Sequence, residues 1–166
     1  STSAIQSLTT AQVGALKTEQ LRALSDDQVA ALREFQVKAL KTNQIAGFSS
    51  AQISSLSSGS IAALSTAQIS KLSTEQIANL SDVQLGALTR AQVGVLTFAG
   101  GTGQLNALSS TQFARLSTAA IAGLSTAQLN AVGSDQIKAL STLQVSTLSA
   151  AQVASLTPSK LALFNG

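Results

Sequence analysis

The chain of 166 residues contains no cysteine, histidine, methionine, tryptophan or tyrosine. Without cysteine it can form no disulfide and offers no thiolate to a metal ion. Without histidine and cysteine it also lacks the usual nucleophile–base pairs of hydrolases and the usual zinc ligands. We therefore expect no catalytic residue, no metal site and no cofactor, and we expect that the protein is not an enzyme.

Aromatic residues and charges are also scarce. Phe is the only aromatic type, with five residues, so the core must be built from Leu, Ile, Val and Ala. Ten Lys and Arg against seven Asp and Glu leave a formal charge of +3, and acids interleave with the bases of the N-terminal part. Because no Tyr or Trp is present for bases to stack on, and no Gly-Arg run occurs, we expect no nucleic-acid partner. No run of eighteen apolar residues occurs either, so we expect no membrane insertion.

The sequence has one motif in abundance, a repeat of eight residues. The segment LSTAQISKLSTEQIANL, residues 64–80, shows it twice. With the recurring Leu as position zero, position one is usually Ser or Thr, position four is Gln in nearly every octad and position five is apolar; Ser60, Ala120 and Lys160 replace the Gln in regular octads. Position zero is filled by Leu8, Leu16, Leu24, Leu32, Leu40, Phe48, Leu56, Leu64, Leu72, Leu80, Leu88, Leu96, Leu108, Leu116, Leu124, Val132, Leu140, Leu148, Leu156 and Phe164.

A period of eight fits neither a strand nor a continuous helix. Positions zero and five would face opposite sides of a strand. On one long helix the apolar stripe would wind round the whole surface, because eight residues overshoot two turns by about 80°. The tetrads STAQ and STEQ instead match the capping box, in which Ser and Gln each accept a hydrogen bond from the other's backbone amide. The sequence therefore predicts one short helix of about two turns per octad, with positions zero and five forming a hydrophobic staple.

The positions of proline and of the charged residues agree with this register. Pro158 follows Thr157, at the first helical position, where a missing amide hydrogen costs nothing. Lys17, Arg33 and Lys41 occupy cap positions and are expected to weaken those caps. All seven acids fall at the first or second helical position, which the helix dipole favours: Glu19, Asp26, Asp27, Glu34, Glu75, Asp82 and Asp135.

Helices this short are unstable alone in water, so they must stack and bury their staples in one continuous core. We predict an all-α fold, a solenoid or superhelix of about twenty short capped helices, one per eight-residue repeat. Residues 1–166 then form a single repeat domain, with octads over 1–96 and 108–166. The sequence does not indicate how many helices complete one turn of the coil.

A glycine-rich insertion at residues 97–107 separates the two series of octads. It reads TFAGGTGQLNA and adds four residues between Leu96 and Leu108. Gly100, Gly101 and Gly103 invite comparison with phosphate-binding loops, but no G-x-x-x-x-G-K or G-x-G-x-x-G motif is present and no strand precedes them. We expect a surface bulge or hinge that the solenoid tolerates.

Octads of this LSTAQIAA type resemble the long repeat tracts of large secreted or surface-exposed bacterial proteins of the adhesin and haemagglutinin-like kind. The resemblance extends over essentially the whole chain, from STSAIQSL to KLALF. It implies an extracellular or cell-surface location and a structural role, as a stalk, a matrix component or a filament. The resemblance implies no functional residue.

The two ends of the solenoid predict self-association. Solenoids normally need polar capping repeats, whereas here Ile5 and Leu8 lie in the first repeat and Leu161, Leu163 and Phe164 lie in the last. We expect these residues to mediate head-to-tail stacking into a homo-oligomer or filament, because a heterologous contact that does not close makes a fibre. Alternatively, neighbouring repeats of a longer chain cover both ends.

Two other functions remain open at this point. The chain could be a solenoid module that binds other surface proteins or glycans. That alternative gains support if the unusual apolar residues Phe35, Val83, Phe98 and Leu143 converge on one face. A minor alternative is ice binding by the regular Ser and Thr array, although most of these hydroxyls are needed as helix caps.

Overall fold

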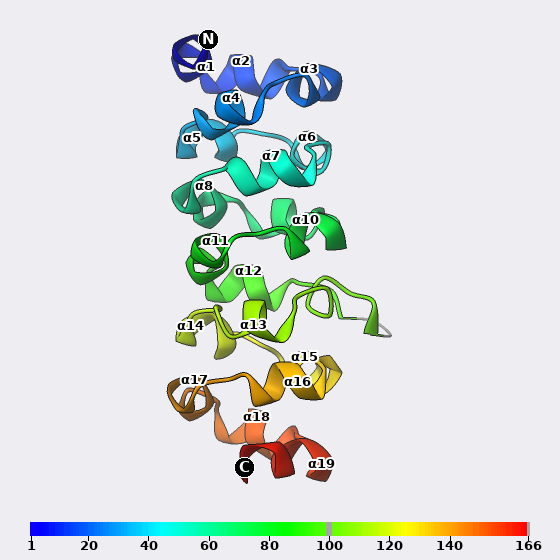
Figure 1. The fold of residues 1–166 in the computed structure, drawn as a ribbon. Coiled ribbons are helices and arrows are strands. Elements are labelled where there is room, and N and C mark those ends of the chain that lie inside the picture. Colours follow the sequence, from blue (N-terminus) through cyan, green and yellow to red (C-terminus); the bar gives the residue numbers. More distant parts are fainter. Residues whose placement is uncertain (99–100, 166) are drawn as a thin grey trace.

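The computed structural model describes residues 1–98 and 101–165, and this part of the chain consists of helices joined by tight turns (Figure 1). The helices before the insertion are α1 (Thr2–Ser7), α2 (Thr10–Ala15), α3 (Thr18–Arg22), α4 (Asp26–Ala30), α5 (Glu34–Lys38), α6 (Thr42–Ala46), α7 (Ser50–Ser55), α8 (Ser58–Ala63), α9 (Thr66–Ile69), α10 (Thr74–Ala78), α11 (Asp82–Ala87) and α12 (Arg90–Gly94). Those after it are α13 (Ser110–Phe113), α14 (Thr118–Ile121), α15 (Thr126–Ala131), α16 (Ser134–Lys138), α17 (Thr142–Ser146), α18 (Ala150–Ser155), α19 (Pro158–Leu161) and the 3-10 helix η2 (Ala162–Asn165). The prediction of one short helix per octad is confirmed.

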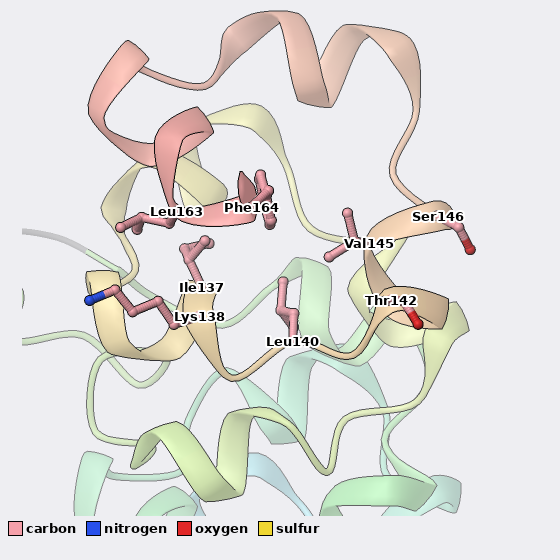
Figure 2. Close-up of a pocket in the computed structure, with 8 residues that line it drawn as sticks. All are labelled: Ile137, Lys138, Leu140, Thr142, Val145, Ser146, Leu163 and Phe164. Carbon is pink, nitrogen blue, oxygen red and sulfur yellow. The ribbon is translucent and has the colours of Figure 1, made fainter. Parts of the chain in front are cut away.

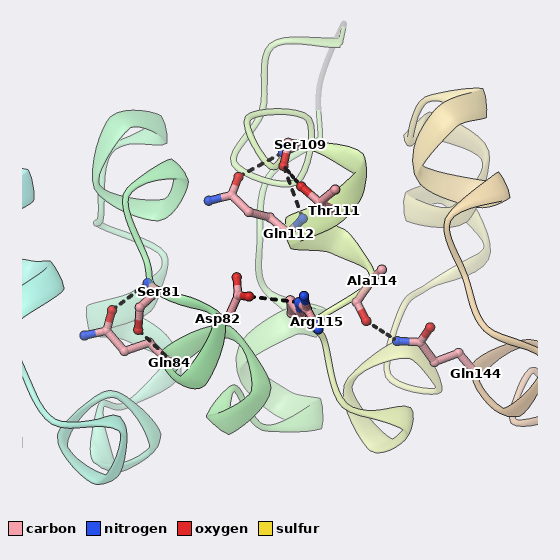
Figure 3. Close-up of polar contacts among 9 residues, drawn as sticks. All are labelled: Ser81, Asp82, Gln84, Ser109, Thr111, Gln112, Ala114, Arg115 and Gln144. Carbon is pink, nitrogen blue, oxygen red and sulfur yellow. Dashed lines mark hydrogen bonds and ion pairs between the residues drawn. The ribbon is translucent and has the colours of Figure 1, made fainter.

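Most helices begin at the predicted capping box. At α11, Ser81 is extended (φ −69°, ψ 162°), and its hydroxyl accepts a hydrogen bond from the Gln84 amide at 3.3 Å. The Gln84 Oε1 atom accepts from the Ser81 amide at 2.9 Å (Figure 3). The side chains of Lys17, Arg33 and Lys41 make no cap hydrogen bond. These three caps therefore lack the side-chain acceptor, and their lower stability stays a prediction.

The helices are shorter than the predicted two turns, because they contain only four to six residues. The reason is that two to four residues of every octad lie outside the helix. Leu56, for example, is extended (φ −61°, ψ 145°), and the cap residue that follows it, Ser57, is extended as well. The Leu56 amide donates to the Ile53 carbonyl at 3.2 Å, which closes the helix in a tight last turn.

Three helices complete one turn of the coil, so a turn contains three octads. Each helix therefore packs on the third helix before it and the third after it, as α8 packs on α5 and α11. The contacts between helices arrange them in three rows. The two ends of the chain lie at opposite ends of an elongated coil (Figure 1). One row contains α2, α5, α8, α11, α13 and α16; the next contains α3, α6, α9, α12, α14 and α17; the third contains α1, α4, α7 and α10, and then α15 and α18.

The core follows the axis of the coil and consists of positions zero and five. The position-five side chains from Val13 to Leu129 are all fully buried, at 0% exposed. From Leu32 to Leu124 the side chains at position zero are buried as well. Phe48 takes the place of Leu at position zero, and Phe113 takes the place of Ile at position five. The predicted staple therefore supplies the hydrophobic interior.

The insertion occupies the place of one helix in the coil. Because α11 packs on α13 and α12 packs on α14, one unnumbered unit lies between α12 and α13. Thr97 and Gln104 form its capping box, with the four extra residues between them. Gly103 lies so close to the Thr97 backbone that a Cβ atom would be 2.3 Å from the Thr97 carbonyl oxygen. Ala99 and Gly100, which belong to the predicted bulge, lie outside the described residues.

Candidate functional site

The junction between two turns is held by the glutamine at position four, which is buried. Gln84 is representative: its Oε1 atom caps α11, and its Nε2 atom points to the preceding turn. Nε2 donates to the carbonyls of Leu56 at 2.7 Å, Ile53 at 3.1 Å and Ser54 at 3.2 Å. The Gln84 side chain thus bonds backbone groups at the ends of two helices, where groups lack partners within the helix. It accepts from a backbone amide at the start of its own helix and donates to backbone carbonyls at the end of α7.

The same bond from a Gln Nε2 atom to a position-zero carbonyl recurs along the coil. The carbonyl lies 28 residues earlier in the chain, or 32 residues earlier where the insertion lies between the two partners. The pairs are Gln36–Leu8, Gln44–Leu16, Gln52–Leu24, Gln68–Leu40, Gln76–Phe48, Gln84–Leu56, Gln92–Leu64, Gln104–Leu72, Gln128–Leu96, Gln136–Leu108, Gln144–Leu116 and Gln152–Leu124. The sequence pattern predicted only the capping role of Gln, and this second role was missed. A signal was present, because Glu caps a helix as well as Gln does but occurs at no position four, and only an amide also donates.

Lys160 replaces the glutamine at position four of α19 and makes the same contacts with an ammonium group. Its Nζ atom donates to the carbonyls of Leu129, Asn130 and Val132 at 2.5–2.9 Å. Partial burial disfavours the charged form and lowers the pKa of Lys160 below its ordinary value of 10.5.

Every junction therefore pairs two unlike surfaces. The N-terminal surface of a turn, which faces the turn before it, presents the Gln Nε2 donors. The C-terminal surface of the turn before it presents the position-zero carbonyls. In the first turn the N-terminal surface is uncovered: Leu8, Leu16 and Leu24 are half-buried, and Gln12 and Gln20 are exposed. Within the described residues, Nε2 of Gln12 and of Gln20 has no hydrogen-bond partner.

The last turn exposes the opposite surface. At position five, Val145 is half-buried, Val153 is 38% exposed and Leu161 is 37% exposed, against 0% for most of their counterparts in the interior. The carbonyls of Leu148 and Leu156 accept no hydrogen bond from the described residues. A groove of 320 Å³ opens here over α16 and α17, as Figure 2 shows. It is lined by Ile137, Lys138, Leu140, Thr142, Val145, Ser146, Leu163 and Phe164.

Four of the five residues predicted to mediate self-association lie on these two surfaces. Leu163 and Phe164 line the groove, and Leu161 is exposed at the same end of the coil. Leu8 is half-buried at the opposite end, whereas Ile5 faces the core and is 8% exposed. Within one chain the structure keeps the two sets apart, so contact between them requires a second chain.

Comparison with known protein families identifies the repeat. The model of the ALTTAQ repeat matches residues 13–42, 35–66, 55–82, 61–98 and 107–142, and together these matches cover well over half of the chain. The chain belongs to the ALTTAQ repeat family. The unmatched residues 99–106 coincide with the insertion, so the family motif and the octads are the same unit. A search of the curated proteins finds none that matches the chain.

The unusual apolar residues do not form one patch on the ALTTAQ coil. Phe35 (50% exposed) lies on α5 and Val83 (70% exposed) on α11, which are separated by α8 in their row. Leu143 (66% exposed) lies on α17, in another row, and Phe98 is half-buried beside the insertion. The convergence that a binding face would require is not observed.

An ion pair also joins neighbouring turns of the ALTTAQ coil. The Arg115 guanidinium contacts the Asp82 carboxylate at 2.9 Å (Figure 3), but both side chains are about 60% exposed, and pairs of this kind stabilise a fold only slightly. In the described part of the chain, no three acidic side chains come together as metal ligands would. Among the same residues, no helix has the length and apolarity needed to cross a bilayer.

Proposed function

We propose that this ALTTAQ repeat chain is a structural, non-enzymatic protein of an extracellular bacterial assembly. In this proposal the coil either joins end to end into a filament or serves as a stalk, spacer or matrix component. Its resemblance to repeat tracts of adhesin- and haemagglutinin-like proteins supports the cell-surface location. The proposal needs no cofactor and no nucleic-acid partner.

The observation that carries the proposal is the role of the buried polar side chains. Among the described residues, the buried polar side chains are twelve glutamines and Ser60, and all of them occupy position four. Every one of these glutamines donates to the turn before its own. Buried polar groups that serve only to cap helices and to join one turn to the next are typical of a scaffold whose length is its function.

Binding to a protein or a glycan is the alternative, and the scattered positions of Phe35, Val83, Phe98 and Leu143 do not favour it. Ice binding is not favoured either, because the Ser and Thr side chains at position one are engaged as caps, as Ser81 and Thr89 are.

The scaffold role is tested by lengthening the coil. A second copy of residues 57–80, which form one complete turn, is inserted after Leu80, and both chains are measured as monomers by small-angle X-ray scattering at low concentration. We expect a larger maximum dimension and an unchanged cross-section. A thicker particle of unchanged length would contradict the spacer role.

The location is tested on intact bacteria that express the chain from its native gene. We expect an antibody against the coil to label the cells without permeabilisation. Labelling that appears only after permeabilisation would contradict the extracellular part of the proposal.

A further inference from the structure

We propose that the first turn of one chain docks on the last turn of a second copy through the same bonds that join turns within a chain. In the docked pair, α1, α2 and α3 of one copy lie over α17, α18 and α19 of the other. The inference rests on the end-to-end assembly proposed above and names the surfaces and atoms that form it.

The groove at the last turn lies on a face of α17 that no described helix covers. Inside the coil, α14 is covered by α17 and α15 is covered by α18, as the rule of three helices per turn requires. The outer surface of α17 would be covered by the next helix of its row, and the described residues supply none. Thr142, Val145 and Ser146 of α17 therefore line an open groove, which Leu163 and Phe164 border (Figure 2).

The apolar groups of the two ends are complementary. The apolar positions that are left partly exposed differ between the two ends of the coil. The first turn leaves Leu8, Leu16 and Leu24 partly uncovered, and these residues are the position-zero set. The last turn leaves Val145, Val153 and Leu161 uncovered, and these are the position-five set. Docking would bury both sets in one step.

The hydrogen-bonding groups are complementary as well. With α2 over α18, Nε2 of Gln12 reaches the Leu148 carbonyl, in the same relation that Gln152 has to Leu124 within the chain. With α3 over α19, Nε2 of Gln20 reaches the Leu156 carbonyl. All four groups lack a hydrogen-bond partner among the described residues. Because donors lie at one end and acceptors at the other, the contact is heterologous and repeats without closing, which makes a filament.

The substitutions Gln12→Glu and Gln20→Glu test the donors without removing the caps. Glu retains the oxygen that accepts from the cap amide, but it cannot donate, and its charge would face a carbonyl in the docked pair. We expect the double variant to remain folded and its association constant to fall by about tenfold to a hundredfold per residue. The matched control is Ala51→Glu with Ala67→Glu, which adds the same charge at exposed sites in the middle of the coil.

The opposite surface is tested by Val153→Glu, with Leu161→Glu as a second variant if the first does not fold by circular dichroism. The first-turn double variant keeps an intact last turn, and Val153→Glu keeps an intact first turn. Sedimentation velocity over a concentration series should therefore show monomers for each variant alone and dimers for their equimolar mixture. The wild type and the mid-coil control should form longer oligomers.

Three outcomes would overturn the inference. They are a wild type that stays monomeric at every concentration, variants that assemble as the wild type does, and a mixture that forms no dimer. None of these outcomes affects the scattering and labelling tests of the scaffold role, so failure of the docking is distinguishable from failure of the proposed function.

Discussion

Thr97 and Gln104 cap one another across seven residues, although the same reciprocal bonds span only three residues elsewhere in the coil. The Thr97 amide donates to Gln104 Oε1 at 3.0 Å, and the Gln104 amide donates to Thr97 Oγ1 at 3.1 Å. The Leu105 amide donates to the Thr97 carbonyl at 3.0 Å, the bond that begins a helix in the regular octads. The insertion is therefore accommodated inside one capping box, and the coil continues in phase after it.

Deleting residues 100–103 should leave the fold intact. The deletion converts TFAGGTGQ into TFAQ, an ordinary first half of an octad. We expect the free energy of unfolding to be unchanged or to rise by about 1 kcal/mol, because a shorter loop costs less entropy to close. Urea denaturation followed by circular dichroism measures the change. Deleting residues 75–78 is the control and should unfold the coil. If deleting residues 100–103 lowered the free energy of unfolding by more than about 2 kcal/mol, the coil would not merely accommodate the insertion within one capping box.

Replacing a bridging glutamine should be costly in the interior and mild in the first turn. Gln84→Met keeps the size of the side chain but leaves the Ser81 amide and the buried Leu56 carbonyl without their partner, and it removes one bond each from the Ile53 and Ser54 carbonyls. We expect a loss of about 2–3 kcal/mol in the free energy of unfolding. Gln12→Met removes only a cap bond at an exposed site and should cost less than about 1 kcal/mol. Equal losses in the two variants would refute the bridging role.

Gly133→Ser should stabilise the protein. Gly133 occupies the cap position of α16 with φ −68° and has no side chain to accept a hydrogen bond. A Cβ atom there would meet only Gln136 Oε1, at 3.6 Å, so a serine fits without strain. We expect a gain of about 1 kcal/mol, measured by the urea midpoint. Gly133→Ala fills the same space without an acceptor, and a similar gain in that variant would show that the hydroxyl is not the cause.

Lys160→Gln should stabilise the last turn at neutral pH and change its pH dependence. A neutral amide replaces a partly desolvated charge, and we expect a gain of about 1 kcal/mol. Since the pKa of Lys160 is lowered in the folded protein, the unfolded chain binds this proton more tightly in the pH window just below 10.5. The wild type should therefore gain stability relative to Lys160→Gln as the pH rises from 8 towards 10.5. Urea midpoints of both proteins at several pH values measure this difference, and a constant difference would contradict it.

The local structure was predictable from the sequence because its causes are local. A cap residue, the Gln three positions later and the staple formed by positions zero and five lie within one octad, as in Ser81, Gln84 and Leu85. Pro158 at the first position of α19 follows the same logic. The length of each helix was overestimated, because the capping box specifies where a helix begins and does not specify where it ends.

The number of helices per turn was not predictable, because it depends on contacts between octads that are three apart. The bond from Gln36 to the Leu8 carbonyl and the packing of α5 on α8 select that number, and neither is visible in an eight-residue pattern. The end surfaces were predicted as apolar from Leu8, Leu161, Leu163 and Phe164. Their donor and acceptor groups were missed, since a glutamine that caps its own helix gives no sign of its second partner.

The bridging glutamines have a direction, because each Nε2 atom donates to a carbonyl nearer the N-terminus. The glutamine of a newly made octad therefore finds its acceptors in chain that has already been synthesised. The separation between partners also stays near 28 residues however many octads are added. We expect such a coil to fold progressively as it leaves the ribosome or an export channel, with a rate per turn that does not fall as the coil grows.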